Sequence, residues 1–171
     1  MSLSHTILCV GGGTIGSVTP LLAVVEELRQ RDSSIRVLWW GTAGGPERAV
    51  VIRAGIPFSE LYSGKLRRYL SFKNIIDAVH ILAGGVQALW RFGFSRPTVM
   101  LAAGSYVAVP AAWAAWLYGV PVCIHQLDVE PGLANKLIAP IARKITVTFP
   151  DSAWAYPASR TVVTCSPVRA A

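Results

Sequence analysis

Acidic residues are scarce in this chain of 171 residues: nine Asp and Glu stand against sixteen Lys and Arg, a formal net charge of +7. The shortage argues against cationic partners and favours anionic ones, such as phosphate groups, nucleic acid or an anionic membrane surface. Charged residues make up only 15% of the chain and hydrophobic residues 53%, so much of the sequence must be buried or rest on an apolar surface. The length suffices for one well-buried domain.

Cysteine is also rare, and Cys9, Cys123 and Cys165 are far apart in apolar, strand-like surroundings. This spacing argues against a disulfide framework and against a cysteine-based metal site, and it predicts reduced core residues of a cytosolic protein. The first residues lack a basic segment followed by a long apolar core, so we expect no signal peptide. We also expect no metal and no cofactor.

Charge is absent from residues 98–124, a stretch long enough to cross a bilayer. Gly104, Pro110, Gly119 and Pro121 interrupt it, however, where a strand–turn–helix–strand unit has its breaks. Strand-like apolar residues stand at both of its ends. We therefore expect a buried βαβ unit here rather than a transmembrane helix.

Apolar strand-like and helical segments alternate along the whole chain. Strands are expected near residues 6–10, 35–40, 56–61, 98–102, 121–125, 144–149 and 160–164, and helices near 19–30, 46–54, 73–91, 107–118 and 132–140. This alternation predicts an α/β fold with a parallel sheet covered on both faces. Ligands of such sheets bind at the carboxyl ends of the strands.

The first expected strand runs into a glycine-rich turn at residues 11–17, and an amphipathic helix follows. Strand, glycine turn and helix together present backbone N–H groups at a helix N-terminus, a natural site for an anionic group. The spacing is not the dinucleotide fingerprint, because Ser17 follows Gly16 and no acidic residue ends the second strand; nor is it a P-loop, because no Gly-Lys-Ser/Thr follows. A phosphate-binding loop and a merely tight structural turn both fit this pattern.

Four more polar segments fall at expected carboxyl ends of strands, at residues 41–45, 64–68, 104–106 and 125–128. Two glycine turns, a tri-basic loop and a polar cluster on one rim are hard to explain as structure alone.

These segments, taken in order, resemble the amino-terminal half of the MurG family. The Gly-Lys-Leu-Arg-Arg run at 64–68 and the Pro-Gly-Leu-Ala-Asn run at 131–135 are the most specific matches. The other matching positions cover most of the chain: Gly12-Gly13-Thr14, Gly16, Pro20, Gly41-Thr42, Gly45, Glu47, residues 54–58, Gln87-Ala88, Gly104, Tyr106, Val107, Pro110, residues 119–121, Ile124-His125 and residues 167–169.

The resemblance implies an inverting hexosyltransferase of GT-B fold, which moves N-acetylglucosamine from UDP-GlcNAc to lipid I, an undecaprenyl-pyrophosphate-linked sugar, and so makes lipid II for peptidoglycan. A GT-B enzyme has two Rossmann-like, doubly wound domains. Residues 1–165 would form the acceptor-binding, membrane-facing domain, peripheral at the cytoplasmic face of the plasma membrane. Residues 166–171, with Arg169 on the donor or linker side, would begin the linker to a donor-binding domain that this chain lacks. Activity would then need a separate donor-binding subunit.

The resemblance also implies the site residues. The acceptor pyrophosphate would be held by the first loop and by the polar segments after later strands: Gly12, Gly13, Thr14, Gly16, Gly104, Ser105, Tyr106 and Asn135. Membrane headgroups would meet basic and apolar residues before and along the long helix: Lys65, Arg67, Arg68, Lys73, Ile75 and Val79. A solvated basic loop and a helix packed in the core are the alternatives for this second group.

Departures from the family pattern gather in the polar centre. The family's first loop usually reads Gly-Gly-Thr-Gly-Gly-His, and here Ile15 and Ser17 replace a glycine and the histidine; Ser105 likewise replaces a glycine. The family's His-Glu-Gln-Asn becomes His125-Gln126-Leu127-Asp128. Ser17 is a candidate catalytic residue by its position, but it cannot act unaided as a base at neutral pH. We therefore expect His125 and Asp128 to supply the proton acceptor, with Asp128 orienting the ring of His125. For His125 a hydrogen-bonded structural role, and for Asp128 a role in capping the next turn, are the alternatives.

Three functions remain open. The chain is the acceptor-binding half of a MurG-like glycosyltransferase, inactive alone; or it is a non-catalytic or degenerate domain that binds pyrophosphate-lipid and membrane. A nucleic-acid-binding domain ranks last, because no aromatic–basic interleaving and no known module are present, and we expect no nucleic-acid partner.

Overall fold

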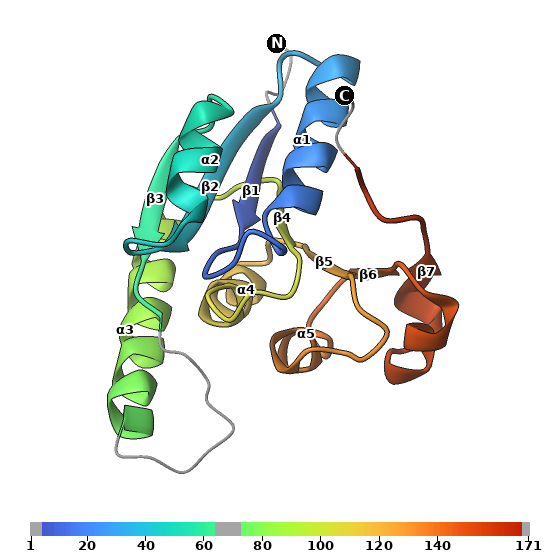
Figure 1. Cartoon of the computed structure of the whole chain (residues 1–171). Coiled ribbons are helices and arrows are strands. Elements are labelled where there is room, and N and C mark those ends of the chain that lie inside the picture. Colours follow the sequence, from blue (N-terminus) through green and yellow to red (C-terminus); the bar gives the residue numbers. More distant parts are fainter. Residues whose placement is uncertain (1–4, 64–72, 169–171) are drawn as a thin grey trace.

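The structure is a computed structural model that describes residues 5–63 and 73–168, with the side chains of the second range from residue 79 onward. Strands and helices alternate along the described chain (Figure 1) in the order β1 (Thr6–Val10), α1 (Thr19–Arg31), β2 (Arg36–Thr42), α2 (Glu47–Arg53), β3 (Phe58–Leu61), α3 (Lys73–Phe94), β4 (Val99–Ala102), α4 (Ala108–Leu117), β5 (Val122–Gln126), α5 (Leu133–Ile138), β6 (Lys144–Val147), the 3₁₀ helices η1 (Pro150–Ala155) and η2 (Ala158–Arg160), and β7 (Thr161–Val163).

The seven strands form one sheet in the order β3-β2-β1-β4-β5-β6-β7, and every neighbouring pair is parallel. The chain builds outward from β1 in one direction and then, from β4, in the other. The strand order therefore reverses between β1 and β4, where Leu8 pairs with Met100. In such sheets the crevice beyond the carboxyl ends of these two strands is the usual ligand site.

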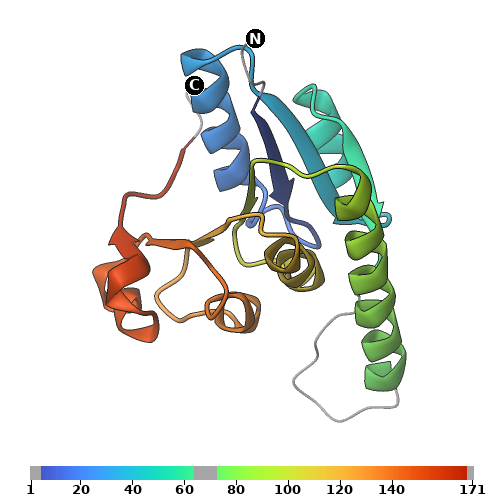
Figure 2. The same ribbon diagram turned by 180° about the vertical axis from the view of Figure 1, so that it is seen from behind.

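Helices cover both faces of the sheet, as Figures 1 and 2 show from opposite sides. Alternate residues of a strand point to opposite faces, so Leu8 and Val10 pack with α3, α4 and α5, while Ile7 and Cys9 pack with α1 and α2. The Rossmann-like, doubly wound α/β architecture that the sequence predicts is therefore confirmed.

Most predicted elements agree with the structure to within about three residues. The charge-free stretch 98–124 forms the unit β4-α4-β5. In the part of the chain that the structure describes, no helix is both long and apolar enough to cross a membrane. The sequence interpretation missed η1 and η2, because short 3₁₀ turns leave no periodic apolar pattern.

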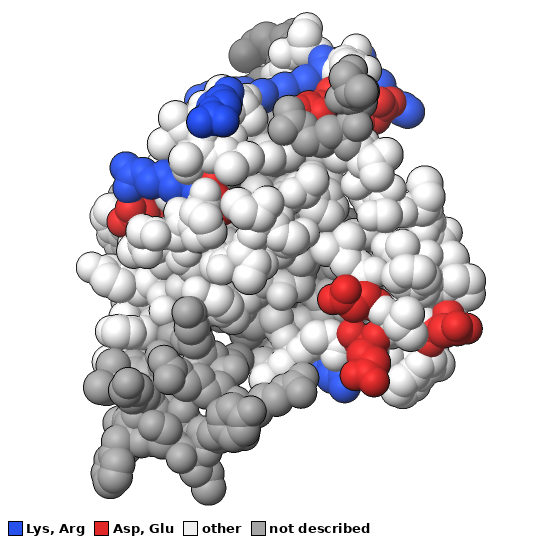
Figure 3. Space-filling model, viewed as in Figure 1, with Lys and Arg blue, Asp and Glu red and all other residues white. Residues whose placement is uncertain are grey.

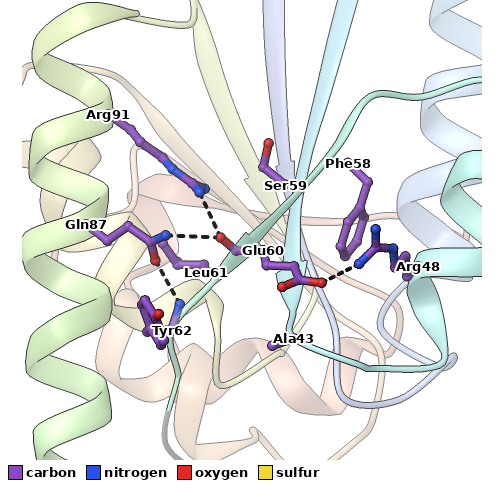
Figure 4. A pocket seen from close by; sticks show the side chains of 9 residues that line it. All are labelled: Ala43, Arg48, Phe58, Ser59, Glu60, Leu61, Tyr62, Gln87 and Arg91. Atoms are coloured by element: carbon purple, nitrogen blue, oxygen red, sulfur yellow. Dashed lines mark hydrogen bonds and ion pairs between the residues drawn. The ribbon is translucent and has the colours of Figure 1, made fainter.

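Helix α3 seals the outer edge of the sheet. Strand β3 is an edge strand, whose outward backbone groups need partners. The Gln87 amide accepts a hydrogen bond from Tyr62 N at 2.9 Å and donates one to Glu60 O at 3.3 Å, and Arg91 donates to the same carbonyl at 2.8 Å (Figure 4). Between these groups and the ion pair Arg48–Glu60 lies an open pocket of about 540 Å³. The side chains of α3 thus replace a neighbouring strand, which fixes the helix beside the carboxyl rim.

Candidate active site

The loop after β1 and the turn after β4 are joined at the point where the strand order reverses. The Ser105 hydroxyl donates to Gly12 O at 2.7 Å and accepts from Gly12 N at 3.0 Å, and Ser105 is buried. The two residues are 93 positions apart in the sequence. Ser105, which we expected at the acceptor, therefore uses its one proton to lock the two loops together.

Tyr106 packs directly on the first loop. Gly13 has a φ of +80°, which disfavours any residue with a side chain. A Cβ added there would lie 2.6 Å from the Tyr106 ring, so the ring occupies the space above this glycine. The turn before Tyr106 uses Gly104 in the same way, at a φ of +82°. The positive φ favours glycine at both positions, and at Gly13 the close approach of the Tyr106 ring excludes a side chain as well.

Glu47 is a functional-site residue to which the sequence analysis gave no role. Its carboxylate is completely buried and accepts three hydrogen bonds: from Gly13 N at 3.2 Å, from Thr42 N at 2.7 Å and from Thr42 Oγ1 at 2.5 Å. The available signal was an acidic side chain five residues after a Gly-Thr turn that ends a strand.

These bonds correct one expectation. The N–H groups of Gly12 and Gly13 donate to Ser105 and Glu47, so they are not free for a pyrophosphate. Thr14, Ile15 and Gly16 are exposed and form the accessible part of the loop, directly before helix α1.

Ser17 closes the loop from inside. Its hydroxyl donates to Thr14 O at 3.2 Å, and the residue is buried. This geometry agrees with the chemical argument that a lone serine is no general base at neutral pH. Ser17 thus shapes the loop.

His125 is buried on the face of the sheet that α1 covers, beside a largely apolar cavity of about 250 Å³. Its Nδ1 lies 2.8 Å from Thr146 Oγ1 and its Nε2 lies 3.2 Å from Thr148 Oγ1. Because Thr146 Oγ1 itself donates to Ile124 O, the network favours the tautomer with the proton on Nδ1. Burial lowers the pKa of His125 below its usual 6.5, so the ring is neutral at pH 7.

Asp128 does not orient His125, which corrects a second expectation. Two threonine hydroxyls bond the ring nitrogens, whereas Asp128 is exposed in the loop beyond β5. In the described ranges no hydrogen bond joins the two side chains. The physical reason is the strand period: His125 points through one face of the sheet, and Asp128 lies past the strand end.

Asn135, expected to touch the acceptor, is part of a buried amide network, in which its Oδ1 has no hydrogen-bond partner among the described residues. Its Nδ2 donates to His125 O at 3.1 Å and to Gln126 Oε1 at 2.7 Å, and Tyr156 OH donates to the same Oε1 at 2.9 Å. Burial raises the pKa of Tyr156 to about 12, so it keeps this proton. Gln126 Nε2 donates to the carbonyls of Asp128 and Glu130. A glutamate in place of Gln126 has no N–H to donate, so the amide found here suits this network.

Acidic side chains gather at one end of the rim. Figure 3 shows a group of them beside the loops that follow β5 and β6, whereas most of the coloured Lys and Arg on this face lie toward the opposite end, where other acidic residues stand beside them. Asp128 and Glu130 are exposed in the first of these loops. An anionic ligand is therefore better placed at the first loop than at the end of β5.

The apolar residues of α3 extend into solvent. Val79 is 58% exposed, and its face of the helix continues at steps of three and four residues through Leu82, Val86, Trp90 and Phe94, all at least 66% exposed. We call these five residues the α3 stripe. Helix α4 packs beside α3 and adds the exposed Trp113, Trp116 and Leu117. Of the other residues expected at the membrane, Lys65, Arg67 and Arg68 lie outside the described residues, and the side chains of Lys73 and Ile75 are not described. Arg169, expected on the donor or linker side, also lies outside the described residues.

Comparison with known proteins agrees with the fold. Residues 7–147 match the model of the glycosyltransferase family 28 N-terminal domain. The chain is 37% identical over 163 residues, 95% of its length, to the UDP-N-acetylglucosamine–N-acetylmuramyl-(pentapeptide) pyrophosphoryl-undecaprenol N-acetylglucosamine transferase of Clostridium kluyveri, and 38% identical over 171 residues to that of Treponema pallidum. It covers 46% and 44% of these two relatives, so the chain spans about half their length.

Solved structures give the same picture. The crystal structure of MurG from Acinetobacter baumannii superimposes with a TM-score of 0.79 and 28% identity, over 97% of this chain and 46% of that one. A UDP complex of MnaA from S. aureus matches with a TM-score of 0.69 at 16% identity, over 94% and 44% of the two chains. This second likeness concerns the fold alone.

Proposed function

The chain belongs to glycosyltransferase family 28, whose N-terminal domain it contains, and from this premise we propose that it is the acceptor-binding half of a MurG-like glycosyltransferase. The whole enzyme transfers N-acetylglucosamine from UDP-GlcNAc to lipid I, an undecaprenyl-pyrophosphate-linked sugar, and yields lipid II for peptidoglycan. The single observation that carries the proposal is the locked pair of loops at the switch point, Gly12 with Ser105. This pair presents an exposed loop segment where open α/β sheets bind ligands.

The pyrophosphate of the acceptor binds at Thr14, Ile15 and Gly16. These exposed residues precede helix α1, which is 13 residues long, so its N-terminal dipole favours an anion there. Tyr106 stands over Gly13 and forms one wall. The N–H groups of Val18 and Thr19 donate to Ile15 O, and Pro20 has no N–H, so the backbone donors that we propose for the pyrophosphate are those of the exposed segment itself.

Transfer proceeds by attack of an acceptor hydroxyl oxygen on the anomeric carbon of the donor sugar. The new C–O bond forms on the face opposite the leaving UDP, whose bond to that carbon breaks with its electron pair. The hydroxyl proton needs a base, and the exposed carboxylate of Asp128 is our candidate. We give His125 a structural role and not that of the base, because both of its ring nitrogens are hydrogen-bonded and burial lowers its pKa. UDP-GlcNAc binds mainly to the donor domain, supplied by a separate polypeptide or by further sequence.

The α3 stripe and the neighbouring tryptophans of α4 rest on the membrane that carries the acceptor. An amphipathic helix with exposed Trp, Phe and Leu lies in the plane of a bilayer interface. Both ribbon views show the first turns of α3 running past the carboxyl ends of the strands, beside the rim (Figures 1 and 2). Lys65, Arg67 and Arg68 lie outside the described residues; near the membrane each of them would add attraction to anionic lipid of about 1 kcal/mol. We place the protein peripherally at the cytoplasmic face of the plasma membrane.

The test is a glycosyltransfer assay with radiolabelled UDP-GlcNAc and a lipid I analogue. This chain is assayed alone and with the donor-binding domain of a relative. We expect no transfer by the chain alone, because the reacting groups must be held from both sides of the cleft to within about an ångström. Transfer is expected once the second domain is added, and robust transfer by the chain alone contradicts the proposal.

A matched pair of variants tests the base. Asp128→Asn should lower turnover by about a hundredfold, a typical general-base contribution. Asp151→Asn changes another exposed carboxylate, on η1, and should leave turnover as it was. Equal rates for the two variants would remove Asp128 from the mechanism.

The second candidate is a non-catalytic domain that binds pyrophosphate-lipid and membrane without turnover. It is favoured by Ser17, which stands where the family has a histidine and is bonded within the loop, and by the occupied ring nitrogens of His125. Binding of the lipid I analogue in flotation, with no transfer whichever donor domain is added, would select this function.

A further inference from the structure

Glu47 is a buried charge held by hydrogen bonds. Its side chain has no exposed surface, and among the described residues no ion pair involves it. Its three donors are the N–H of Gly13 and the N–H and hydroxyl of Thr42. A buried carboxylate is tolerated only when such donors surround it. These donors come from the ends of two different strands, so one side chain ties the first loop to the loop after β2.

The glycines of both loops make room for this carboxylate. A Cβ added to Gly12 would lie 2.2 Å from Glu47 Oε1, and one added to Gly45 would lie 2.2 Å from Glu47 Oε2. Atoms in real structures do not approach so closely, so neither position accepts a larger residue while Glu47 stays in place. The second glycine of the first loop is thus explained by Glu47 and not by a ligand.

We propose that Glu47 is a positioning residue of the anion-binding loop. By accepting the Gly13 N–H it keeps that group turned inward and holds Gly13 at its φ of +80°. Beyond Gly13 the backbone turns away from the Glu47 carboxylate, and the next three residues, Thr14, Ile15 and Gly16, are exposed. Glu47 touches no ligand itself. The inference rests on the proposed function only in taking pyrophosphate as the anion that this segment binds.

The test uses Glu47→Gln, which keeps the shape of the side chain. If Oε1 stays on the two Thr42 donors, the new Nε2–H₂ faces the Gly13 N–H, donor against donor, and that bond is lost. The rate of amide hydrogen exchange at Gly13, followed by NMR on this chain, measures whether its hydrogen bond to residue 47 is kept. Calorimetric titration with inorganic pyrophosphate measures the affinity of the loop for the anion. We expect exchange at Gly13 to become about tenfold faster and pyrophosphate binding about tenfold weaker.

Glu27→Gln is the matched control. It removes the same charge from an exposed ion pair with Arg31 on α1, and it should change neither the exchange at Gly13 nor the affinity. Thr42→Val is the second variant, for the case that Glu47→Gln does not fold. It removes one donor to the same carboxylate and should move both measurements in the same direction by a smaller factor.

Two results overturn the proposal: unchanged exchange at Gly13 in Glu47→Gln, or faster exchange there with unchanged pyrophosphate affinity. If the unaltered chain does not bind pyrophosphate, the proposed acceptor site is wrong. Exchange at Gly13 then still decides whether Glu47 holds the loop, so the two failures are distinguishable.

Discussion

The hydroxyl of Ser105 and the backbone of Gly12 exchange two hydrogen bonds, at 2.7 and 3.0 Å, across the point where the strand order reverses. Both residues are buried, so no water replaces a lost partner. A single serine therefore couples the end of β1 to the end of β4.

Ser105→Ala should lower the free energy of unfolding by about 1–3 kcal/mol, because it leaves the buried N–H and carbonyl of Gly12 without partners. Urea denaturation followed by circular dichroism measures the change. Ser33→Ala, in the exposed turn after α1, is the control and should stay within about 0.5 kcal/mol of the parent. An equal, small effect at both positions would show that the Ser105 bonds contribute little.

Gly84→Ala and Gly85→Ala should shift stability in opposite directions. A Cβ at Gly84 would lie 2.0 Å from Tyr62 O, so α3 would have to move away from β3, at a cost of about 1–3 kcal/mol. A Cβ at Gly85 meets nothing within 4 Å, so alanine should stabilise the helix by about 1 kcal/mol. Thermal unfolding of the two variants measures both, and stabilisation by both would mean that the contact of α3 with β3 is loose.

Acidification below pH 6.5 should destabilise the protein through His125. Burial lowers the pKa of this ring in the folded state, so below 6.5 the unfolded chain binds the proton more readily. Stability is therefore complete above pH 6.5 and falls as the pH drops from there toward the folded pKa. Midpoints of urea denaturation at pH 7.5 and 5.5 measure the loss of stability. His125→Gln should reduce this loss, whereas His80→Gln, which changes an exposed side chain on α3, should leave it as it is. The same pH dependence in His125→Gln and the parent would contradict this assignment.

Leu82→Asp and Trp90→Asp should each weaken binding to vesicles that contain anionic lipid by about tenfold, because each removes an apolar side chain worth about 1.5–3 kcal/mol when buried. Flotation at low and high salt measures binding, and high salt should release much of the protein. Trp154→Asp alters a tryptophan on η1 that is more exposed than Trp90, and is the control. If all three variants float like the parent, α3 does not face the membrane.

The amino-acid sequence by itself determined the order of the elements and the place of the rim. Apolar runs of strand length alternate with helical periods, and parallel strands joined by helices put their carboxyl ends on one edge, so 11–17 and 104–106 were expected on the same rim. That they touch there depends on the pairing of β1 with β4, which only the structure gave. Gly13 and Gly104 were also readable as turn glycines, since local backbone geometry alone demands them. Such features depend on neighbours within a few residues along the chain.

Only the tertiary structure decided which hydrogen-bond donors pair with which acceptors in the site. His125 lies opposite Thr146 because β5 and β6 pair in that register, and this pairing gave the ring hydroxyl partners instead of Asp128. Glu47 reaches Gly13 from 34 residues away because α2 begins beneath the first loop. No local pattern encodes these contacts: a buried donor or acceptor takes the nearest partner that packing supplies, and packing brings together residues that are far apart in the sequence.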